Sequence, residues 1–177
     1  MRQKLLAFLM IFLTCIAFPV FAQPTNVVLQ KSLGMSFFSE TEMLFLFRII
    51  VALGLGIVCG LTHGWTQKSV NISTKTFAAV CLGSATFTSV MVHINVLTGI
   101  PNIMNGMGNV MTGIGFVCAA VIFRQGKAIS GLSTAATLWT SAGIGMACGS
   151  AMYGIAVVVT LIISLFHFFP SYSGEQA

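Results

Sequence analysis

GIGFVCAAVIFRQGKAISGLSTAATLWTSAGIGMACG, the stretch from Gly113 to Gly149, decides the class of fold. It holds an apolar run, a turn with the cations Arg124 and Lys127, and then a run rich in glycine and hydroxyl residues that contains no acid. A helix of this composition has little reason to form in water. In lipid, small and hydroxyl residues let helices approach closely and hydrogen-bond across their interface. The stretch therefore predicts a membrane location.

The composition of the whole chain indicates the same class. Hydrophobic residues make up 56% of the 177 residues and charged residues only 6%, against roughly a quarter in soluble domains. The formal net charge of +5 comes from eight Lys and Arg against three acids. Because these cations are scattered one or two per loop, we expect no nucleic-acid partner. We predict an all-α integral membrane protein in a lipid bilayer.

The first 22 residues have the pattern of a targeting segment. Arg2 and Lys4 form a positive region, Leu5 to Phe18 an apolar region, and the small residues before Gln23 a cleavage site. We expect cleavage after Ala22, and the alternative is an uncleaved signal anchor. Either way residues 23–42 form a periplasmic tail, and residues 43–169 form the membrane domain.

Four apolar segments predict five membrane helices, because the last segment is long enough for two. A bilayer core of about 30 Å needs about 20 helical residues, so the uncharged run from Leu132 to Phe169 must break, and Gly149-Ser150-Ala151 is the expected point. The cations then follow the positive-inside rule, which predicts a bacterial inner-membrane protein with a periplasmic N-terminus and residues 170–177 in the cytoplasm. The predicted spans are Met43–Leu61, Thr76–Leu97, Gly106–Phe123, Leu132–Cys148 and Met152–Phe169.

Small residues recur every four positions in the first and fourth of these helices. Side chains four apart share a helix face, so each set forms a shallow groove that admits another backbone. The grooves serve either ordinary packing inside the protein or a partner helix, from a second copy or another protein. The two sets are Ala52, Gly56 and Gly60 in the first helix, and Ser141, Gly145 and Gly149 in the fourth.

Arg48 is the first candidate functional residue, because a charged side chain within hydrocarbon costs about 2.5 to 3.5 kcal/mol near the centre of a span. It either extends to the outer interface along its apolar stem or faces inward to bind a helix carbonyl end, a partner acid or an anion. Any carboxylate from this chain would come from Glu40 or Glu42, since no predicted span contains an acid.

Other polar residues carry weaker signals. We expect His93 and His167, near helix ends, to be interfacial, Trp65 to lie in a cytoplasmic loop, and Trp139, in the middle of a span, to lie in the core. The hydroxyl face of the fourth helix either hydrogen-bonds a neighbouring helix or lines a small polar cavity. It consists of Thr134, Thr137 and Ser141.

The sequence lacks the residues of a catalytic or metal site. Asp is absent, and there are no paired carboxylates, no phosphate-binding loop and no Cys or His cluster at ligand spacing. We therefore expect no enzyme, no cofactor and no bound metal. Magnesium in particular is normally held by carboxylates and waters. The cysteines within the predicted spans are expected to be small packing residues: Cys59, Cys81, Cys118 and Cys148.

The stretch from Gly113 to Gly149 closely resembles the signature of the MgtC/SapB family of bacterial inner-membrane proteins, which reads roughly GIGFLGAGVIxRxGxxVxGLxTAATLWxSAxIGxxxG. The resemblance extends over about residues 47–169. Departures occur at Thr62-His63, where the family usually has an acidic and basic pair, and at Asn102 and Asn105, which replace an acid and an Arg. Besides Arg48, Thr134 and Thr137, the candidate functional residues are Lys75, Thr76, Arg124, Ser133 and Trp139.

The resemblance implies an inner-membrane factor for growth in low magnesium and for virulence through survival inside host cells. In the family this is attributed to modulation of the membrane part of ATP synthase. Many members carry a soluble C-terminal domain, for which the residues after Phe169 are too few. The leading hypothesis is a non-enzymatic regulator that contacts a membrane-protein partner or a second copy. The alternative is a small transporter or channel for magnesium or another ion, with a path along the Thr/Ser/Gly face of the fourth helix.

Overall fold

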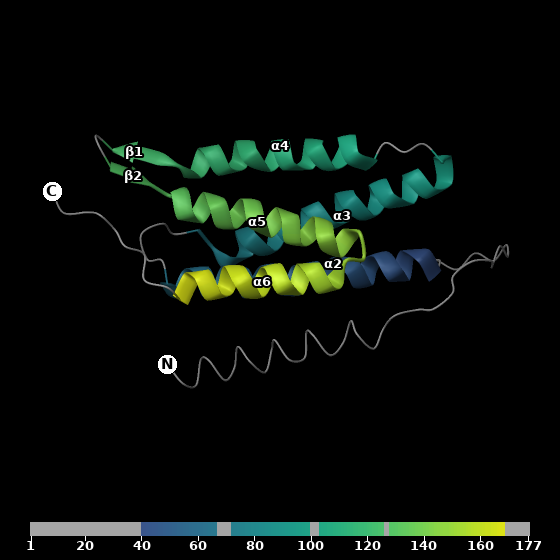
Figure 1. Cartoon of the computed structure of the whole chain (residues 1–177), viewed down its shortest axis with the longest axis horizontal. Helices are drawn as coiled ribbons and strands as arrows, with labels where there is room; N and C mark the ends of the chain where they lie inside the picture. Colours follow the sequence, from purple (N-terminus) through teal and green to yellow (C-terminus); the bar gives the residue numbers. More distant parts are fainter. Residues whose placement is uncertain (1–39, 67–71, 100–102, 126–127, 169–177) are drawn as a thin grey trace, which may run out of the picture.

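The computed structural model describes residues 40–66, 72–99, 103–125 and 128–168, and within these ranges the chain forms a bundle of five helices with one short hairpin (Figure 1). The expected signal segment, the tail up to residue 39 and the residues after 168 lie outside the described ranges. In chain order the elements are α2 (Glu40–Thr66), α3 (Thr74–Thr98), α4 (Ile103–Val121), β1 (Phe123–Gln125), β2 (Ala128–Ser130), α5 (Leu132–Gly149) and α6 (Tyr153–Phe168).

These helices confirm the prediction of an all-α membrane protein with five helices in the membrane domain. Three helices, α2, α3 and α4, are long and apolar enough to cross a bilayer, and α6 is a shorter apolar helix. The helix α2 starts earlier and ends later than the predicted span, so that His63 and Trp65 lie on the helix. The expectation that Trp65 lies in a loop is therefore wrong.

A two-stranded hairpin joins α4 to α5, where the sequence predicted only a turn. Phe123 pairs with Ser130 and Gln125 with Ala128 in antiparallel register, and α4 ends at Val121. In the sequence, Gly126 and Lys127 stand between the two strands. The hairpin lets α5 return beside α4.

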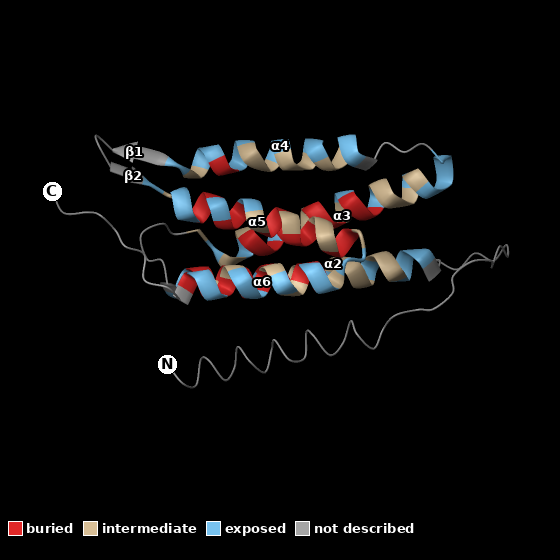
Figure 2. Ribbon diagram, in the orientation of Figure 1, coloured by how far each residue is buried: buried red, intermediate tan, exposed pale blue. Residues whose placement is uncertain are grey.

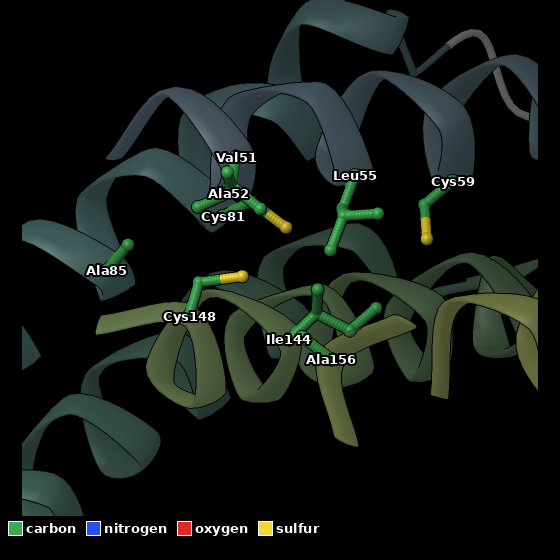
Figure 3. Packing of buried hydrophobic residues seen from close by; sticks show 9 residues of the cluster. All are labelled: Val51, Ala52, Leu55, Cys59, Cys81, Ala85, Ile144, Cys148 and Ala156. Atoms are coloured by element: carbon green, nitrogen blue, oxygen red, sulfur yellow. The ribbon is translucent and has the colours of Figure 1, made fainter. Parts of the chain in front are cut away.

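The core lies where α2, α3 and α5 all pack against one another. A Cβ added at Gly56 of α2 would lie 2.8 Å from Cys81 Cβ, and one added at Gly145 of α5 would collide with the Cys81 carbonyl oxygen. Both small-residue grooves therefore admit α3, and the backbones approach closely. Figure 3 shows the apolar cluster around this contact: Val51, Ala52, Leu55, Cys59, Cys81, Ala85, Ile144, Cys148 and Ala156.

The helix α4 lies at the edge of the bundle. Of its side chains that the structure describes, only Cys118 is buried, and Figure 2 shows the rest of α4 as exposed or intermediate. Phe116 is 81% exposed and Met104 is 78% exposed. Most of the α4 surface is thus left for lipid or for another protein.

The turn between α5 and α6 falls at the predicted break. The amide of Met152 donates to the Ala147 carbonyl at 2.8 Å, and the amide of Ala151 donates to the Cys148 carbonyl at 2.9 Å. This is the Schellman pattern, in which the residue after the C-cap adopts a left-handed conformation and is usually glycine. Here that residue is Ala151, with φ of 62°.

Candidate functional site

Two polar clusters lie inside the bundle, and the first is built around Arg48. The Nη1 atom of Arg48 donates to the carbonyl oxygen of Gly149 at 3.0 Å, and the hydroxyl of Ser89 donates to the same oxygen at 3.3 Å. The guanidinium also lies 5.4 Å from the centre of the Phe45 ring. The side chain therefore faces the bundle.

The position of Arg48 is favourable because Gly149 is the last residue of α5. The final carbonyls of a helix have no partner within the helix and carry a partial negative charge. A cation placed there satisfies a carbonyl and offsets part of its own cost of burial. Of the inward-facing alternatives raised by the sequence, this geometry corresponds to the binding of a helix carbonyl end.

The second cluster joins two histidines at the opposite end of the bundle. His63 of α2 and His167 of α6 have exposed fractions of only 1% and 6%. Nδ1 of His63 lies 3.3 Å from Nε2 of His167. Thr134 Oγ1 lies 3.2 Å from Nε2 of His63, and Thr137 Oγ1 lies 3.2 Å from Nε2 of His167. The cluster thus ties α2, α5 and α6 together, and the expectation that His167 is interfacial is wrong.

Hydrogen-bond directions in this cluster follow from Thr137. Its hydroxyl donates to the Ser133 carbonyl at 3.0 Å, so towards Nε2 of His167 it is an acceptor, and that nitrogen carries a hydrogen. Nδ1 of His63 then accepts from His167, and Nε2 of His63 carries the hydrogen that Thr134 accepts. In this neutral arrangement Nδ1 of His167 is an acceptor, and it is buried with no partner among the described residues.

The hydroxyl face of α5 makes contacts with its neighbours. Thr134 and Thr137 contact the histidines, and Ser141 donates to the Thr137 carbonyl at 2.8 Å. The carbonyl of Ser141 in turn accepts from the Cys81 thiol at 2.9 Å. Of the two alternatives for this face, the described contacts correspond to hydrogen bonding with neighbouring helices.

Trp139 was expected in the core, and this is wrong, since its side chain is 51% exposed. The buried face of α5 holds residues that permit close approach to α3, such as Ser141 and Gly145. An indole on that face would separate the two backbones, so the only place for Trp139 is the outer face of α5.

The remaining candidates are dispersed. Lys75 and Ser133 are exposed. The Lys75 amide donates to the hydroxyl of Ser73 at 3.3 Å, and in this way Ser73 caps the start of α3. Thr76 lies on a groove between α3 and α4 with a volume of about 690 Å³, which is lined mainly by apolar side chains. Arg124 is placed on β1, and its side chain lies outside the described part of the structure.

Sequence reasoning missed the histidine pair, although a signal was present. The predicted spans alternate in direction, so the end of the first helix, the start of the fourth and the end of the fifth lie at one face of the membrane. His63, Thr134 and His167 occupy these three positions. Taken one at a time, each is a common residue for a helix end.

The described residues contain no group of three or more His, Cys, Asp or Glu side chains that could hold a metal ion. Their polar atoms join one helix to another, at the Arg48 end through Gly149 and at the other end through the histidines. The fold and its internal clusters define a helical integral membrane protein whose polar groups hold the bundle together.

Comparison with known proteins gives the family. The family model described as MgtC matches residues 49–172, and the chain belongs to the MgtC family. It is 35% identical over 119 residues to the protein MgtC of Salmonella typhimurium, which covers 67% of this chain and 49% of that protein.

Two further relatives have similar coverage. An uncharacterised protein of Synechocystis is 36% identical over 121 residues, which cover 67% of this chain and 48% of that protein. The protein MgtC of Brucella abortus is 35% identical over 109 residues, which cover 62% of this chain and 44% of that protein. The chain therefore spans about half the length of the relatives it matches. No solved structure matches it.

Proposed function

We propose that this chain is a non-enzymatic regulator of the bacterial inner membrane, which supports growth in low magnesium and survival inside host cells by contacting the membrane part of ATP synthase. The observation that carries the proposal is the contrast between α4 and the other helices. Glycines of α2 and α5 make close contacts with α3 inside the bundle, whereas only Cys118 is buried among the described side chains of α4.

The α4 surface has features that suit a protein contact. A Cβ added at Gly108, Gly113 or Gly115 would meet nothing within 4 Å. Lipid chains gain little from glycine on a helix surface, whereas a partner helix gains a closer approach. Large apolar side chains, such as those of Met104 and Phe116, stand beside these glycines. In this proposal α4 is the helix that meets the partner.

Photo-crosslinking in native membranes tests the proposal. A photoreactive amino acid replaces Phe116 on α4, and the matched control replaces Ile50 on α2, which is 64% exposed. We expect crosslinks from position 116 to a membrane subunit of ATP synthase and few from position 50. Equal crosslinking from both positions, or crosslinks from position 116 to lipid alone, would contradict the proposal.

The same proposal includes an orientation, in which the N-terminus is periplasmic and the C-terminus cytoplasmic. Reporter fusions after residue 100 should be active as periplasmic reporters, and fusions after Lys127 as cytoplasmic reporters. The reverse pattern would overturn the orientation without affecting the contact proposed for α4.

Ion transport along the hydroxyl face of α5 is the competing function. Its supporting residues, Thr134, Thr137 and Ser141, are all buried in contacts with other helices, which favours the regulator. Purified protein in liposomes gives the direct test. We expect no flux of magnesium or of anions above that of empty liposomes, and a protein-dependent flux would favour the transporter.

A further inference from the structure

Nδ1 of His167 requires an explanation, because buried polar atoms without a partner are uncommon in folded proteins. It lies in a cluster where every other ring nitrogen has a neighbour at 3.2 or 3.3 Å. We propose that His63 and His167 form a proton-binding site, in which a proton from water is held on Nδ1 of His167. The ligand is the proton itself, and the inference is independent of the function proposed above.

The existing hydrogen bonds accommodate the proton at one atom only. When Nδ1 of His167 gains a hydrogen, the ring becomes an imidazolium and Nε2 keeps its own hydrogen. The bonds from Nε2 to Nδ1 of His63 and to Thr137 then become charge-assisted and stronger. A proton on Nδ1 of His63 would instead set two N–H groups face to face at 3.3 Å. Uptake at His167 therefore leaves every described bond of the cluster in place.

The surroundings oppose more than one positive charge. Burial opposes any charge on the rings, but His63 and His167 lie in the last turns of α2 and α6. The carbonyl ends of two helices favour a cation there, while the N-terminal ends of α5 and of α3 oppose it, since Phe77 in the first turn of α3 contacts the His63 ring. With two imidazoles and no carboxylate among the described residues of the cluster, a divalent metal would keep most of its charge uncompensated.

Among the described residues, the side chains that face the pair include no other titratable group. The groups that face it are hydroxyls of α5, the Phe77 ring of α3 at 5.0 Å from the His63 ring, and uncharged side chains of α2 and α6. Lys75 of α3, two residues before Phe77, is exposed. The buried side chains at this end of the bundle are uncharged, and they include Thr62, Phe77, Thr134, Thr137 and Ser164.

Because the pair joins α2 to α6 and both to α5, the proton would alter how firmly this end of the bundle is held. The charge-assisted bonds act between helices that are distant in sequence, since His63 and His167 are 104 residues apart. Acidification at this face should therefore change how firmly α2 and α6 are held together. The site gives the bundle a means of responding to pH.

Nitrogen NMR on the full chain tests the proposal. The protein is labelled with ¹⁵N-histidine, placed in lipid nanodiscs and titrated from about pH 4 to about pH 8. We expect Nδ1 of His167 to gain one proton while His63 stays neutral. We also expect a nitrogen–nitrogen coupling across the bond between the two rings. His93, which packs on Phe45 with ring centres 5.3 Å apart, provides the third signal.

Variants separate the pair from independent histidines. His63→Gln removes the ring nitrogen that accepts from Nε2 of the charged His167, and it should lower the midpoint of the His167 titration by about one pH unit, because a hydrogen bond to the charged form favours that form. The matched control His93→Gln should leave that midpoint unchanged. An unshifted His167 titration in His63→Gln, protonation of both rings, or no titration of either ring would overturn the proposal. The unmodified protein decides the last two points even if a variant fails to fold.

Discussion

The helix α3 meets α5 on one side and α4 on another, and the two contacts differ sharply. Against α5 the backbones approach closely at Gly145, and a Cβ added at Gly149 would lie 2.6 Å from the Ala85 carbonyl oxygen. Against α4 there is a groove of about 690 Å³. Both α4 and α5 contain the same tripeptide, Gly-Ile-Gly, at residues 113–115 and 143–145.

The difference teaches that glycine spacing permits a close contact without creating one. In α5, Gly145 belongs to a face completed by Ser141 and Gly149, and the thiol of Cys81 donates to the Ser141 carbonyl. In α4, a Cβ at Gly113 or Gly115 would meet nothing within 4 Å. Only the tripeptide of α5 lies on a continuous face of small residues, and a polar contact holds that face against α3.

Replacement of Gly145 by Leu should have the largest effect on folding. The new side chain would have to occupy the space of the Cys81 backbone, which has no flexible end to move away. Overpacking of a core costs about 1 to 3 kcal/mol, and more where backbone must shift. We expect a loss of at least about 3 kcal/mol in stability, measured by thermal unfolding in detergent and by folded yield.

Two matched controls accompany this variant. Gly143 lies on the same helix and Gly113 in the corresponding tripeptide of α4, and a Cβ at either position meets nothing within 4 Å. Gly143→Leu and Gly113→Leu should therefore keep the melting temperature of the unmodified protein. If Gly145→Leu melts like its controls, the close contact between α3 and α5 does not exist in the membrane.

Arg48→Gln tests the polar contact at the C-terminal end of α5. A hydrogen bond to a charged group contributes about 1.5 to 3 kcal/mol, and the neutral amide cannot match it at the Gly149 carbonyl. We expect insertion and abundance to persist while complementation of a low-magnesium growth defect is lost. Arg48→Lys should retain part of it, since the charge remains without the planar fork.

The Arg48 variants are compared by growth in low magnesium at equal expression. Ser89→Ala is the matched control, because it removes the other described donor to the same carbonyl and leaves the charge in place. Full growth with Arg48→Gln would mean that the cation has no role in function.

Ala151→Gly should have the smallest effect, and it should stabilise the protein. A left-handed conformation costs a residue with a side chain about 1 to 2 kcal/mol, and Ala151 has φ of 62° at the end of α5. Glycine adopts it freely but loses more freedom on folding, so we expect a gain of about 1 kcal/mol. A lower melting temperature would show that the turn is not left-handed.

The sequence alone predicted the helices well because hydrophobic length and small-residue spacing are local signals. The break after Gly149 followed from the thickness of a bilayer, and the close approach at Gly145 from a repeat of four. The hairpin was missed because its strands are three residues long, too short to show a pattern. The C-terminal end of α2 was placed too early because Thr62-His63 interrupts the apolar run while the helix continues.

The candidate sites were harder to predict, because they depend on which residues meet. Arg48 stood out as a cation within an apolar span, yet its acceptor is a backbone carbonyl 101 residues away. His63 and His167 each had an ordinary explanation until the topology placed them together. Trp139 was assigned to the core by its position along the span, whereas the direction in which it faces depends on α3.

The buried thiols have a practical consequence. Cys81 donates to the Ser141 carbonyl and Cys118 to the Ala135 carbonyl at 3.3 Å, so cysteines from α3 and α4 both attach to the backbone of α5. The four cysteines in the described part of the chain are buried, and none of them forms a disulfide there. A membrane-permeant alkylating reagent would reach them only when helices separate. The rate of alkylation at Cys118, compared with that at Cys81, would then report whether α4 detaches while the rest of the bundle stays closed.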